Sequence, residues 1–534
     1  MPLTCRKSQT SSWRTLLTVA LIWALEIFVF QALSFHFDYP VPLAKRIGAH
    51  VVRLLLDGLF SLGLVLLLPR VLTLGAFLIF IVGSQGLSYY QAVFGRVLSW
   101  QTLSLQFAEG LASLRFEWSY LDWRLLAALL AGLLLKGWLL RRAGAATVSW
   151  RWRLTLGVVS LLAYALLLAV AMWRIDRPEK LRTFASADRF GMTYGFLPLW
   201  ACERFYLDEA QLVREAVAQR ELATSRLSAI EAPQALTGDV VLIQVESLDW
   251  RILHHRVEGR SVMPFLTRLC DQAMCFKIAA IHENGSGDTD FVMLNAVPPS
   301  PTVITYKIRD YPYGETLPQK AARAGYRTVA LHGNSGQFFE RRRTFTRMGF
   351  TCALFLEEIR DELGLPTSLW GIRDDALLQL SQKLLLEKEP EERQLHYLIT
   401  LTSHQPFNFL EPEMALFLPQ RRDVQSRYFN SMHFVDRELE AYINALPENT
   451  LVVIFGDHRA MVEYASEVDV GGGRREYVPL LIHRVGVRLA ERQASRALPV
   501  AQSGELDLID AATYVHGWFS KNGGEGMSGG RSDP

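Results

Sequence analysis

The sequence predicts an α-helical membrane domain with several spans, followed by an α/β domain with a mostly parallel central sheet. Three observations support this prediction. Apolar segments are concentrated in the first 173 of 534 residues, and short β-branched runs alternate with amphipathic stretches after residue 238. The hydrophobic content of 50% and the mean hydropathy of +0.12 are both high for a soluble enzyme.

The membrane domain is predicted from five apolar segments, each close to the ~20 residues that cross a bilayer. They are Leu16–Phe35, Val51–Leu68, Val71–Leu87, Leu125–Leu140 and Leu154–Trp173. The first resembles a signal peptide in having basic residues before it, but its length and its lack of a small-residue cleavage site favour a retained anchor. Glu26 and Asp57 lie inside two segments, and we interpret them as packing groups of the bundle interior rather than as a substrate pathway.

The orientation follows from the basic residues, which stay on the cytoplasmic side of a membrane. Arg6, Lys7 and Arg14 precede the first segment, and Arg70 lies in the turn between the second and third segments. The loop between the fourth and fifth segments contains Arg141, Arg142, Arg151 and Arg153. With five spans, all of them are cytoplasmic and everything after Trp173 is outside. The sequence therefore predicts a multi-pass protein of the cytoplasmic (inner) membrane whose second domain is periplasmic or extracellular.

The chain is expected to have four parts. Residues 1–173 are the five-helix transmembrane domain, 174–238 a polar connecting helical arm, 239–519 the extracytoplasmic α/β domain, and 520–534 a glycine-rich disordered tail. The predicted strands of the α/β domain are Val240–Val245, Thr328–Leu331, Tyr397–Leu401, Leu451–Phe455 and Val478–Ile482. Of the five cysteines, Cys270 and Cys275 are the obvious local disulfide pair on the outer side. The net charge of +2 gives no sign of nucleic-acid binding.

Side chains that can bind a metal follow two of these strands. Val240–Val245 ends at Glu246, and Leu451–Gly456 ends at Asp457 and His458. A third segment sets the hydroxyl of Ser286 between two glycines. Carboxylates, an imidazole and a hydroxyl can together hold one divalent cation, which would lower the pKa of the alcohol and make it a nucleophile.

Five motifs now identify a resemblance. They are Val-Glu-Ser-Leu at 245–248, Gly-Ser-Gly-Asp-Thr-Asp-Phe at 285–291, His-Gly-Asn at 332–334, Ser-His-Gln-Pro-Phe at 403–407 and Phe-Gly-Asp-His at 455–458. In this order, after an N-terminal five-span anchor, they resemble the lipoteichoic acid synthase branch of the alkaline phosphatase and sulfatase superfamily. The resemblance implies an alkaline phosphatase/sulfatase-like fold for the α/β domain.

The resemblance also implies roles for individual residues. The metal ligands would be Glu246, Ser286, Asp457 and His458, with Ser286 as the nucleophile. This branch typically has threonine at that position, so Thr289, three residues later, is the alternative nucleophile. His404 would act at the transferred phosphate, as a catalytic and a substrate-binding residue. The other substrate-binding residues would be His332, Phe339, where the family has tryptophan, and Arg341.

The implied function is a metal-dependent transferase of the cell envelope. It would move phosphoglycerol from phosphatidylglycerol to a glycan or glycolipid acceptor through a covalent intermediate on Ser286, with one divalent cation. Manganese is the first choice for that cation, and magnesium and zinc are the alternatives.

Three other functions stay open. A phosphoethanolamine transferase shares the fold, but such enzymes usually carry a threonine nucleophile and several cysteine pairs. A sulfatase or phosphodiesterase-type hydrolase is the second, although the Cys/Ser-x-Pro-x-Arg motif of sulfatases is absent around Ser286. A non-catalytic homologue that binds lipid or glycan is the third.

Overall fold

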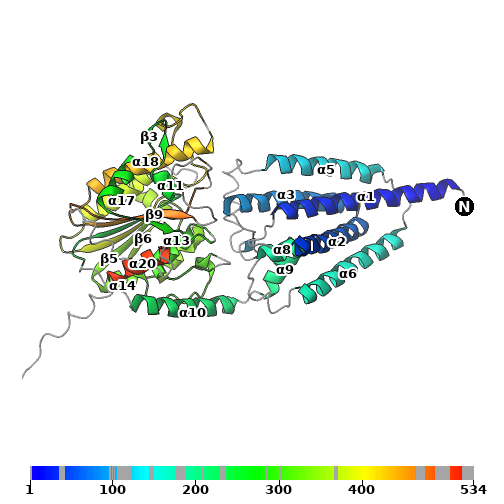
Figure 1. Cartoon of the computed structure of the whole chain (residues 1–534), viewed down its shortest axis with the longest axis horizontal. Helices are drawn as coiled ribbons and strands as arrows, with labels where there is room; N and C mark the ends of the chain where they lie inside the picture. The colour runs from blue at the N-terminus through cyan, green and yellow to red at the C-terminus, as the bar shows by residue number, and fades with distance from the viewer. Residues whose placement is uncertain are drawn as a thin grey trace, which may run out of the picture. The chain divides into compact units, whose positions relative to one another are not determined.

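The computed structural model describes the chain in several stretches that together form two compact units, Met1–Asp208 and Glu209–Pro534 (Figure 1). The described residues are 3–34, 43–94, 98, 100, 103–104, 122–142, 149–175, 187–206, 209–228, 236–283, 285–300, 304–365, 371–421, 423–460, 462, 464, 476–486 and 506–519. The predicted tail, 520–534, lies outside them.

The first unit contains the predicted membrane helices. Its helices are α1 (Leu3–Ser34), α2 (Leu43–Leu67), α3 (Arg70–Phe94), α5 (Trp123–Arg142), α6 (Trp150–Ile175), α8 (Ala187–Tyr194) and α9 (Phe196–Tyr206). Among the described residues, five helices are long and apolar enough to cross a membrane, and they coincide with the five predicted segments. Large apolar side chains on them are exposed, such as Val71 at 78% and Leu134 at 75%, as a lipid-facing surface requires.

Charged side chains of the spans face neighbouring helices, as the packing interpretation expects. Glu26 of α1 forms an ion pair with Lys136 of α5. Asp57 of α2 accepts a hydrogen bond of 3.2 Å from Gln31 Nε2. The buried Arg53 guanidinium donates to the Met192 carbonyl at the end of α8 (2.9 Å), so a polar contact joins the bundle to the helix that follows it.

The second unit is built on a seven-stranded sheet in the order β4-β9-β8-β1-β7-β5-β6. Its strands are β1 (Val240–Val245), β4 (Met274–Ala279), β5 (Tyr326–His332), β6 (Cys352–Leu354), β7 (Arg393–Ile399), β8 (Leu451–Gly456) and β9 (Tyr477–Arg484). The five strands from β8 to β6 are parallel, and β9 and β4 are antiparallel to their neighbours. The predicted mostly parallel sheet is confirmed.

Helices cover both faces of this sheet, because successive side chains of a buried strand point to opposite faces. Val240 and Leu242 of β1 pack in one apolar cluster with α13 (Gly287–Asn295), α14 (Leu317–Arg323) and α20 (Leu508–Gly517). Val241 and Ile243 pack in a second cluster with α12 (Pro264–Gln272), α17 (Asp374–Leu386) and α18 (Val424–Asn444). Figure 1 shows α17 and α18 on one side of the sheet and α14 and α20 on the other. The smaller elements are α10 (Glu209–Ser228), α11 (Trp250–Leu253), β2 (Arg256–Val257), β3 (Arg260–Ser261), η2 (Thr305–Lys307), η3 (Phe338–Glu340), α15 (Arg341–Arg347), α16 (Leu356–Leu363) and η4 (Pro412–Met414).

Three details of the second unit bear on the sequence analysis. Strand β7 begins four residues before its predicted start, because its first residues, such as Arg393 and Gln394, are polar and give no apolar run. The predicted disulfide between Cys270 and Cys275 is present and joins α12 to β4, with a Cα–Cα distance of 5.1 Å. Helix α10, which falls within the predicted connecting arm, lies in this compact unit and packs against α20.

Candidate active site

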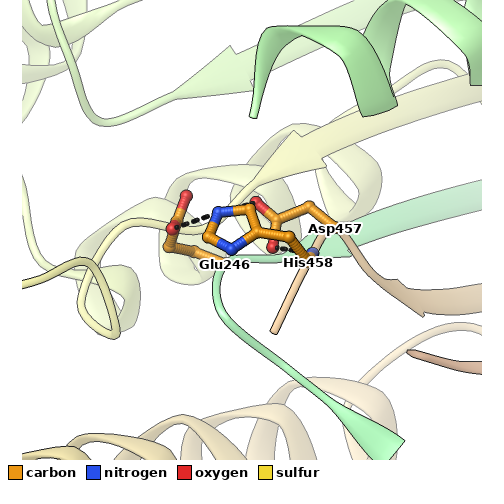
Figure 2. Close-up of side chains that lie close together, drawn as sticks. All are labelled: Glu246, Asp457 and His458. Atoms are coloured by element: carbon orange, nitrogen blue, oxygen red, sulfur yellow. Dashed lines mark hydrogen bonds and ion pairs between the residues drawn. The ribbon is translucent and has the colours of Figure 1, made fainter. Parts of the chain in front are cut away.

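Three potential metal ligands converge at the carboxyl ends of two neighbouring parallel strands. Val245 of β1 is in register with Gly456 of β8, so Glu246 and Asp457, the next residues of the two strands, come side by side. Together with His458 they offer one ligand atom each, and all three atoms lie within 4.8 Å of one another (Figure 2). Gly456 permits this approach, because a Cβ there would lie 1.9 Å from the Leu248 carbonyl oxygen.

The carboxylate of Asp457 is oriented by the backbone on one side only. Its Oδ1 accepts hydrogen bonds from the backbone N–H groups of Ser247 (2.8 Å) and His458 (2.7 Å). Its Oδ2 is buried, and within the described part of the chain no hydrogen bond reaches it. A buried carboxylate oxygen without a hydrogen bond favours a positive charge beside it, and a bound cation would supply one.

The imidazole of His458 presents Nε2 to the two carboxylates. Nε2 lies 3.2 Å from Glu246 Oε1 and 3.6 Å from Asp457 Oδ2. Nδ1 lies 3.0 Å from the Arg459 carbonyl oxygen, so Nδ1–H is the donor and Nε2 is the ligand atom. The ring of His282 stacks on this imidazole with a centroid distance of 4.2 Å and fixes its plane from one side.

Glu246 is held by hydroxyl groups from its own turn and from the loop after β7. Its backbone N–H donates to Thr400 Oγ1 (2.9 Å), and its carbonyl accepts from Ser403 Oγ (2.6 Å). Ser247, which adopts a left-handed conformation at φ 58°, donates its hydroxyl to Glu246 Oε1 (3.0 Å). Three hydroxyl side chains therefore position this carboxylate and its turn.

The electrostatics of the cluster favour a cation. Burial raises the pKa of Asp457 well above its ordinary value, and the neighbouring Glu246 carboxylate adds to the rise. Burial lowers the pKa of His458, but the two carboxylates outweigh it and raise that pKa well above its usual range. Two buried carboxylates and one imidazole are a suitable donor set for a divalent cation, so Glu246, Asp457 and His458 fit one.

Ser286 and Thr289 lie at the start of α13, and the structure separates their surroundings. Ser286 is the N-cap residue, is partly exposed and makes no side-chain cap hydrogen bond; its carbonyl accepts from Gln244 Nε2 (3.3 Å). Thr289 is fully buried, and its hydroxyl donates to the Asp457 carbonyl at 3.1 Å. The first turn of α13 thus lies against the end of β8, with Thr289 facing inward and Ser286 on the accessible side.

The predicted substrate-binding residues His332 and Arg341 contact each other. Burial and the charge of Arg341 lower the pKa of His332 to about 3, so this ring is neutral. Its Nδ1–H donates to the Ile399 carbonyl (3.1 Å), and its Nε2 faces Arg341 Nη1 at 3.4 Å. Arg341 is also paired with Asp290, through Nε to Oδ2 (2.9 Å) and Nη2 to Oδ1 (3.3 Å).

Phe339, the third predicted substrate-binding residue, lies beside the segment that contains Ser286 and Gly287. Its ring is 5.1 Å from the Arg341 guanidinium carbon, and its backbone is left-handed at φ 55°. A Cβ at Gly287 would lie 3.0 Å from this ring, so the residue after Ser286 has to be small. Phe339, Arg341 and the start of α13 therefore form one group of contacts.

His404 lies in a loop whose start is clamped by Asp374. Nδ1–H of His404 donates to the Gln405 carbonyl (2.6 Å). The Asp374 carboxylate accepts from the backbone N–H groups of Leu401 (2.6 Å) and Thr402 (3.0 Å), and burial raises its pKa to about 7. Burial raises the pKa of Glu246, but the charges of His404 and His458 outweigh it and hold this pKa below its ordinary value.

Reasoning from the sequence did not assign Asp290, Asp374, Ser247 or Ser403 to the site. Asp290 carries a weak signal, because it stands in the quoted run 285–291. Ser247 and Ser403 likewise stand in the runs 245–248 and 403–407, but nothing in those runs marks their serines as supports of Glu246. Asp374 acts through hydrogen bonds to Leu401 and Thr402, which only the fold brings near.

Comparisons with known proteins agree with the resemblance inferred from the motifs. Residues 238–501 match the Sulfatase family. The chain is 25% identical over 361 residues to lipoteichoic acid synthase 2 of Bacillus subtilis (62% of this chain, 54% of that protein). It is 24% identical over 303 residues to lipoteichoic acid synthase of Staphylococcus saprophyticus (53% of this chain, 46% of that protein). The chain thus spans about half the length of the curated relatives it matches.

One solved structure is similar along almost the whole chain. It is the integral membrane protein lipooligosaccharide phosphoethanolamine transferase A (EptA) of Neisseria meningitidis, with a TM-score of 0.50 and 16% identity. The match covers 95% of this chain and 94% of that one. The arrangement of apolar helices followed by a sulfatase-like domain is therefore shared.

Proposed function

Because residues 238–501 form a domain of the sulfatase family, we propose that this chain is a metal-dependent phosphoglycerol transferase of the membrane, like the lipoteichoic acid synthases it resembles. The observation that supports this most is the convergence of Glu246, Asp457 and His458 beside the start of α13. There Ser286 presents a hydroxyl that makes no cap hydrogen bond.

The donor in this proposal is phosphatidylglycerol, and the acceptor is a hydroxyl of an envelope glycan or glycolipid. Five helices suited to a membrane hold the chain in the same bilayer as a lipid donor, which raises the effective concentration of that donor. The catalytic domain is placed on the outer side of the cytoplasmic membrane. The distribution of basic residues supports this side, and so does the Cys270–Cys275 disulfide, since disulfides persist in oxidising compartments.

Ser286 is the proposed nucleophile. A divalent cation on Glu246, Asp457 and His458, manganese by preference and otherwise magnesium or zinc, would lower the pKa of this hydroxyl and offset charge on the phosphate. Ser286 Oγ forms a bond to phosphorus, and the bond from phosphorus to the diacylglycerol oxygen breaks. The proton of the Ser286 hydroxyl goes to solvent, and His404 donates the proton with which diacylglycerol leaves and takes one back from solvent. An acceptor oxygen then bonds to phosphorus, the bond to Ser286 Oγ breaks, and the acceptor proton passes to the serine.

Arg341 is proposed to bind the phosphoglycerol group. A guanidinium has five N–H groups. In Arg341, one on Nε and one on Nη2 donate to Asp290, and one on Nη1 donates to His332. Two N–H groups remain for phosphate oxygens, and Asp290 keeps their direction fixed. Neutral His332 accepts from Arg341 and therefore adds no competing negative charge.

Lipid turnover by the full-length protein tests this function. Labelled phosphatidylglycerol and phosphatidylethanolamine are supplied in parallel with Mn²⁺, and diacylglycerol is measured. We expect release from phosphatidylglycerol and its loss in Ser286→Ala. Absence of release from both lipids would contradict any transferase function.

Phosphoethanolamine transfer is the second candidate, favoured by the whole-length fold likeness to EptA. The same assay separates the two, because turnover of phosphatidylethanolamine alone would make the headgroup phosphoethanolamine. The catalytic residues would keep their roles, since the bonds at phosphorus are the same.

A further inference from the structure

A pocket of about 210 Å³ lies between the loop after His404 and the first turns of α18. Phe407 and Leu410 form part of its apolar wall, and Glu411, Arg421 and Arg427 are its charged residues. At this volume it is smaller than typical pockets for drug-sized ligands, which measure roughly 300–1,000 Å³. It therefore suits one sugar ring or a short polyol, and not an acyl chain.

The wall of the pocket is preformed. Asn430 of α18 accepts hydrogen bonds from the backbone N–H groups of Leu416 and Phe417, at 2.7 Å each. Its Nδ2 donates to the carbonyls of Phe417 (2.8 Å) and Ser426 (2.7 Å). One buried amide thus ties the loop to the helix, so a ligand would meet an ordered surface.

Arg427 is the charged residue of this wall whose guanidinium has a buried Nε without a hydrogen bond. No carboxylate of the described residues lies within ion-pair distance of its guanidinium. Arg421, by contrast, donates to Asp423 (2.6 Å) and to Gln425 (3.1 Å). A guanidinium with unused donors is suited to an anionic oxygen, and the nearby Glu411 can accept hydrogen bonds from hydroxyl groups.

The pocket is close to the proposed chemistry along the chain. Phe407, in its wall, is three residues after His404, and three residues of extended chain span at most about 11 Å. The Phe407 side of the pocket therefore begins within about 11 Å of His404.

From these observations we propose that this pocket is the acceptor subsite, and that it binds a hydroxyl-rich acceptor with an anionic group, such as a sugar phosphate. Arg427 would bind the anionic oxygens, and Glu411 would accept from the hydroxyl groups. The inference rests on the proposed transferase function, since it assigns the second substrate of that reaction. The donor headgroup has related chemistry, so the test must separate donor from acceptor.

The test uses full-length protein with phosphatidylglycerol, with glucose 6-phosphate as the acceptor probe and glucose as its neutral counterpart. The readouts are the serine adduct by intact mass and the transferred product. We expect Arg427→Gln to lower the ratio of product to adduct at least tenfold with glucose 6-phosphate, and much less with glucose. Arg437→Gln is the matched control, because Arg437 is an exposed arginine of α18 that pairs with Glu438.

Direct binding of glucose 6-phosphate to the purified protein gives an independent readout, which remains valid if no lipid is turned over. Binding to the wild type that is lost in Arg427→Gln supports the subsite even if the transferase function fails. Three results would overturn it: no binding to the wild type at concentrations to about 10 mM, equal binding and equal product ratios in both proteins, or an Arg427→Gln defect confined to adduct formation. The last result would assign the pocket to the donor.

Discussion

The hydroxyl of Thr289 donates a hydrogen bond of 3.1 Å to the backbone carbonyl of Asp457. Thr289 is fully buried, and this bond joins the helix that Ser286 caps to the strand end that carries Asp457 and His458, two potential metal ligands. The threonine hydroxyl is thus already used inside the protein. The accessible hydroxyl of this segment is that of Ser286.

Ser286→Ala is expected to abolish the covalent adduct and to reduce lipid turnover by at least about a thousandfold, as removal of a nucleophile does elsewhere. Thr289→Val keeps the volume but loses the hydrogen bond, so we expect a stability loss of about 1 kcal/mol with the adduct retained. Intact mass after incubation with phosphatidylglycerol distinguishes the two. An adduct that persists in Ser286→Ala and disappears in Thr289→Val would move the nucleophile to Thr289.

Much of this site could be predicted from the sequence, because its ligands stand where apolar runs stop. Each buried parallel strand ends at the same edge of the sheet, so Glu246, Asp457 and His458 were predictable as neighbours. Asp290 and Asp374 were not, since their partners are 51 and 27 residues away in the chain and their contacts depend on the packing of α13 and α17. The two edge strands, β4 and β6, were missed because only one of the six residues of β4 and none of the three residues of β6 is buried.

Metal removal should destabilise the protein, because a cation that binds only the folded chain stabilises it. At a Mn²⁺ concentration a hundred times Kd, we expect a stabilisation of about 2.7 kcal/mol, seen as a higher thermal midpoint than in chelator. Asp457→Asn should lose most of this gain and bind less metal. Without metal it should be at least as stable as the wild type, because the repulsion from Glu246 is removed. If Mn²⁺ raises the thermal midpoint of Asp457→Asn as much as that of the wild type, Asp457 is not a ligand.

Asp374 should make stability fall as pH rises from about 4 to about 7. Burial raises its pKa from 3.8 to about 7, so in this window the folded protein binds a proton that the unfolded chain releases. Each pH unit in this window lowers the free energy of unfolding by at most about 1.4 kcal/mol. Asp374→Asn should flatten that part of the curve, measured as thermal midpoint against pH.

The comparison between wild type and Asp374→Asn isolates this carboxyl, because Asp436, with a pKa also raised by burial to about 7, contributes the same slope to both proteins. Parallel curves for the two proteins would show that Asp374 does not hold a proton in the folded state.

The ion pair of Arg341 with Asp290 should be costly to break from one side. Both side chains are buried, so Asp290→Asn leaves an unpaired guanidinium and is expected to cost about 3–5 kcal/mol of stability. The double variant Asp290→Asn/Arg341→Gln should recover part of that loss, because no unpaired charge remains, yet it should not recover lipid turnover. Chemical unfolding and the lipid assay measure the two effects. Recovery of turnover in the double variant would contradict a phosphate-binding role for Arg341.

The ion pair of Glu26 with Lys136 makes a similar prediction for the membrane helices. Lys136 of α5 is only 2% exposed and lies 4.7 Å from the centroid of the Phe77 ring of α3, so α1 and α3 enclose its charge. Glu26→Gln alone leaves that charge without a carboxylate in surroundings where unpaired charge costs several kcal/mol. The double variant Glu26→Gln/Lys136→Met should therefore unfold at a higher temperature than Glu26→Gln in the same detergent. Leu134→Met, an exposed apolar change on α5, is the control that should leave the midpoint unchanged. If the losses from Glu26→Gln and Lys136→Met simply add in the double variant, the two charges do not interact and α1 and α5 are held together by apolar packing alone.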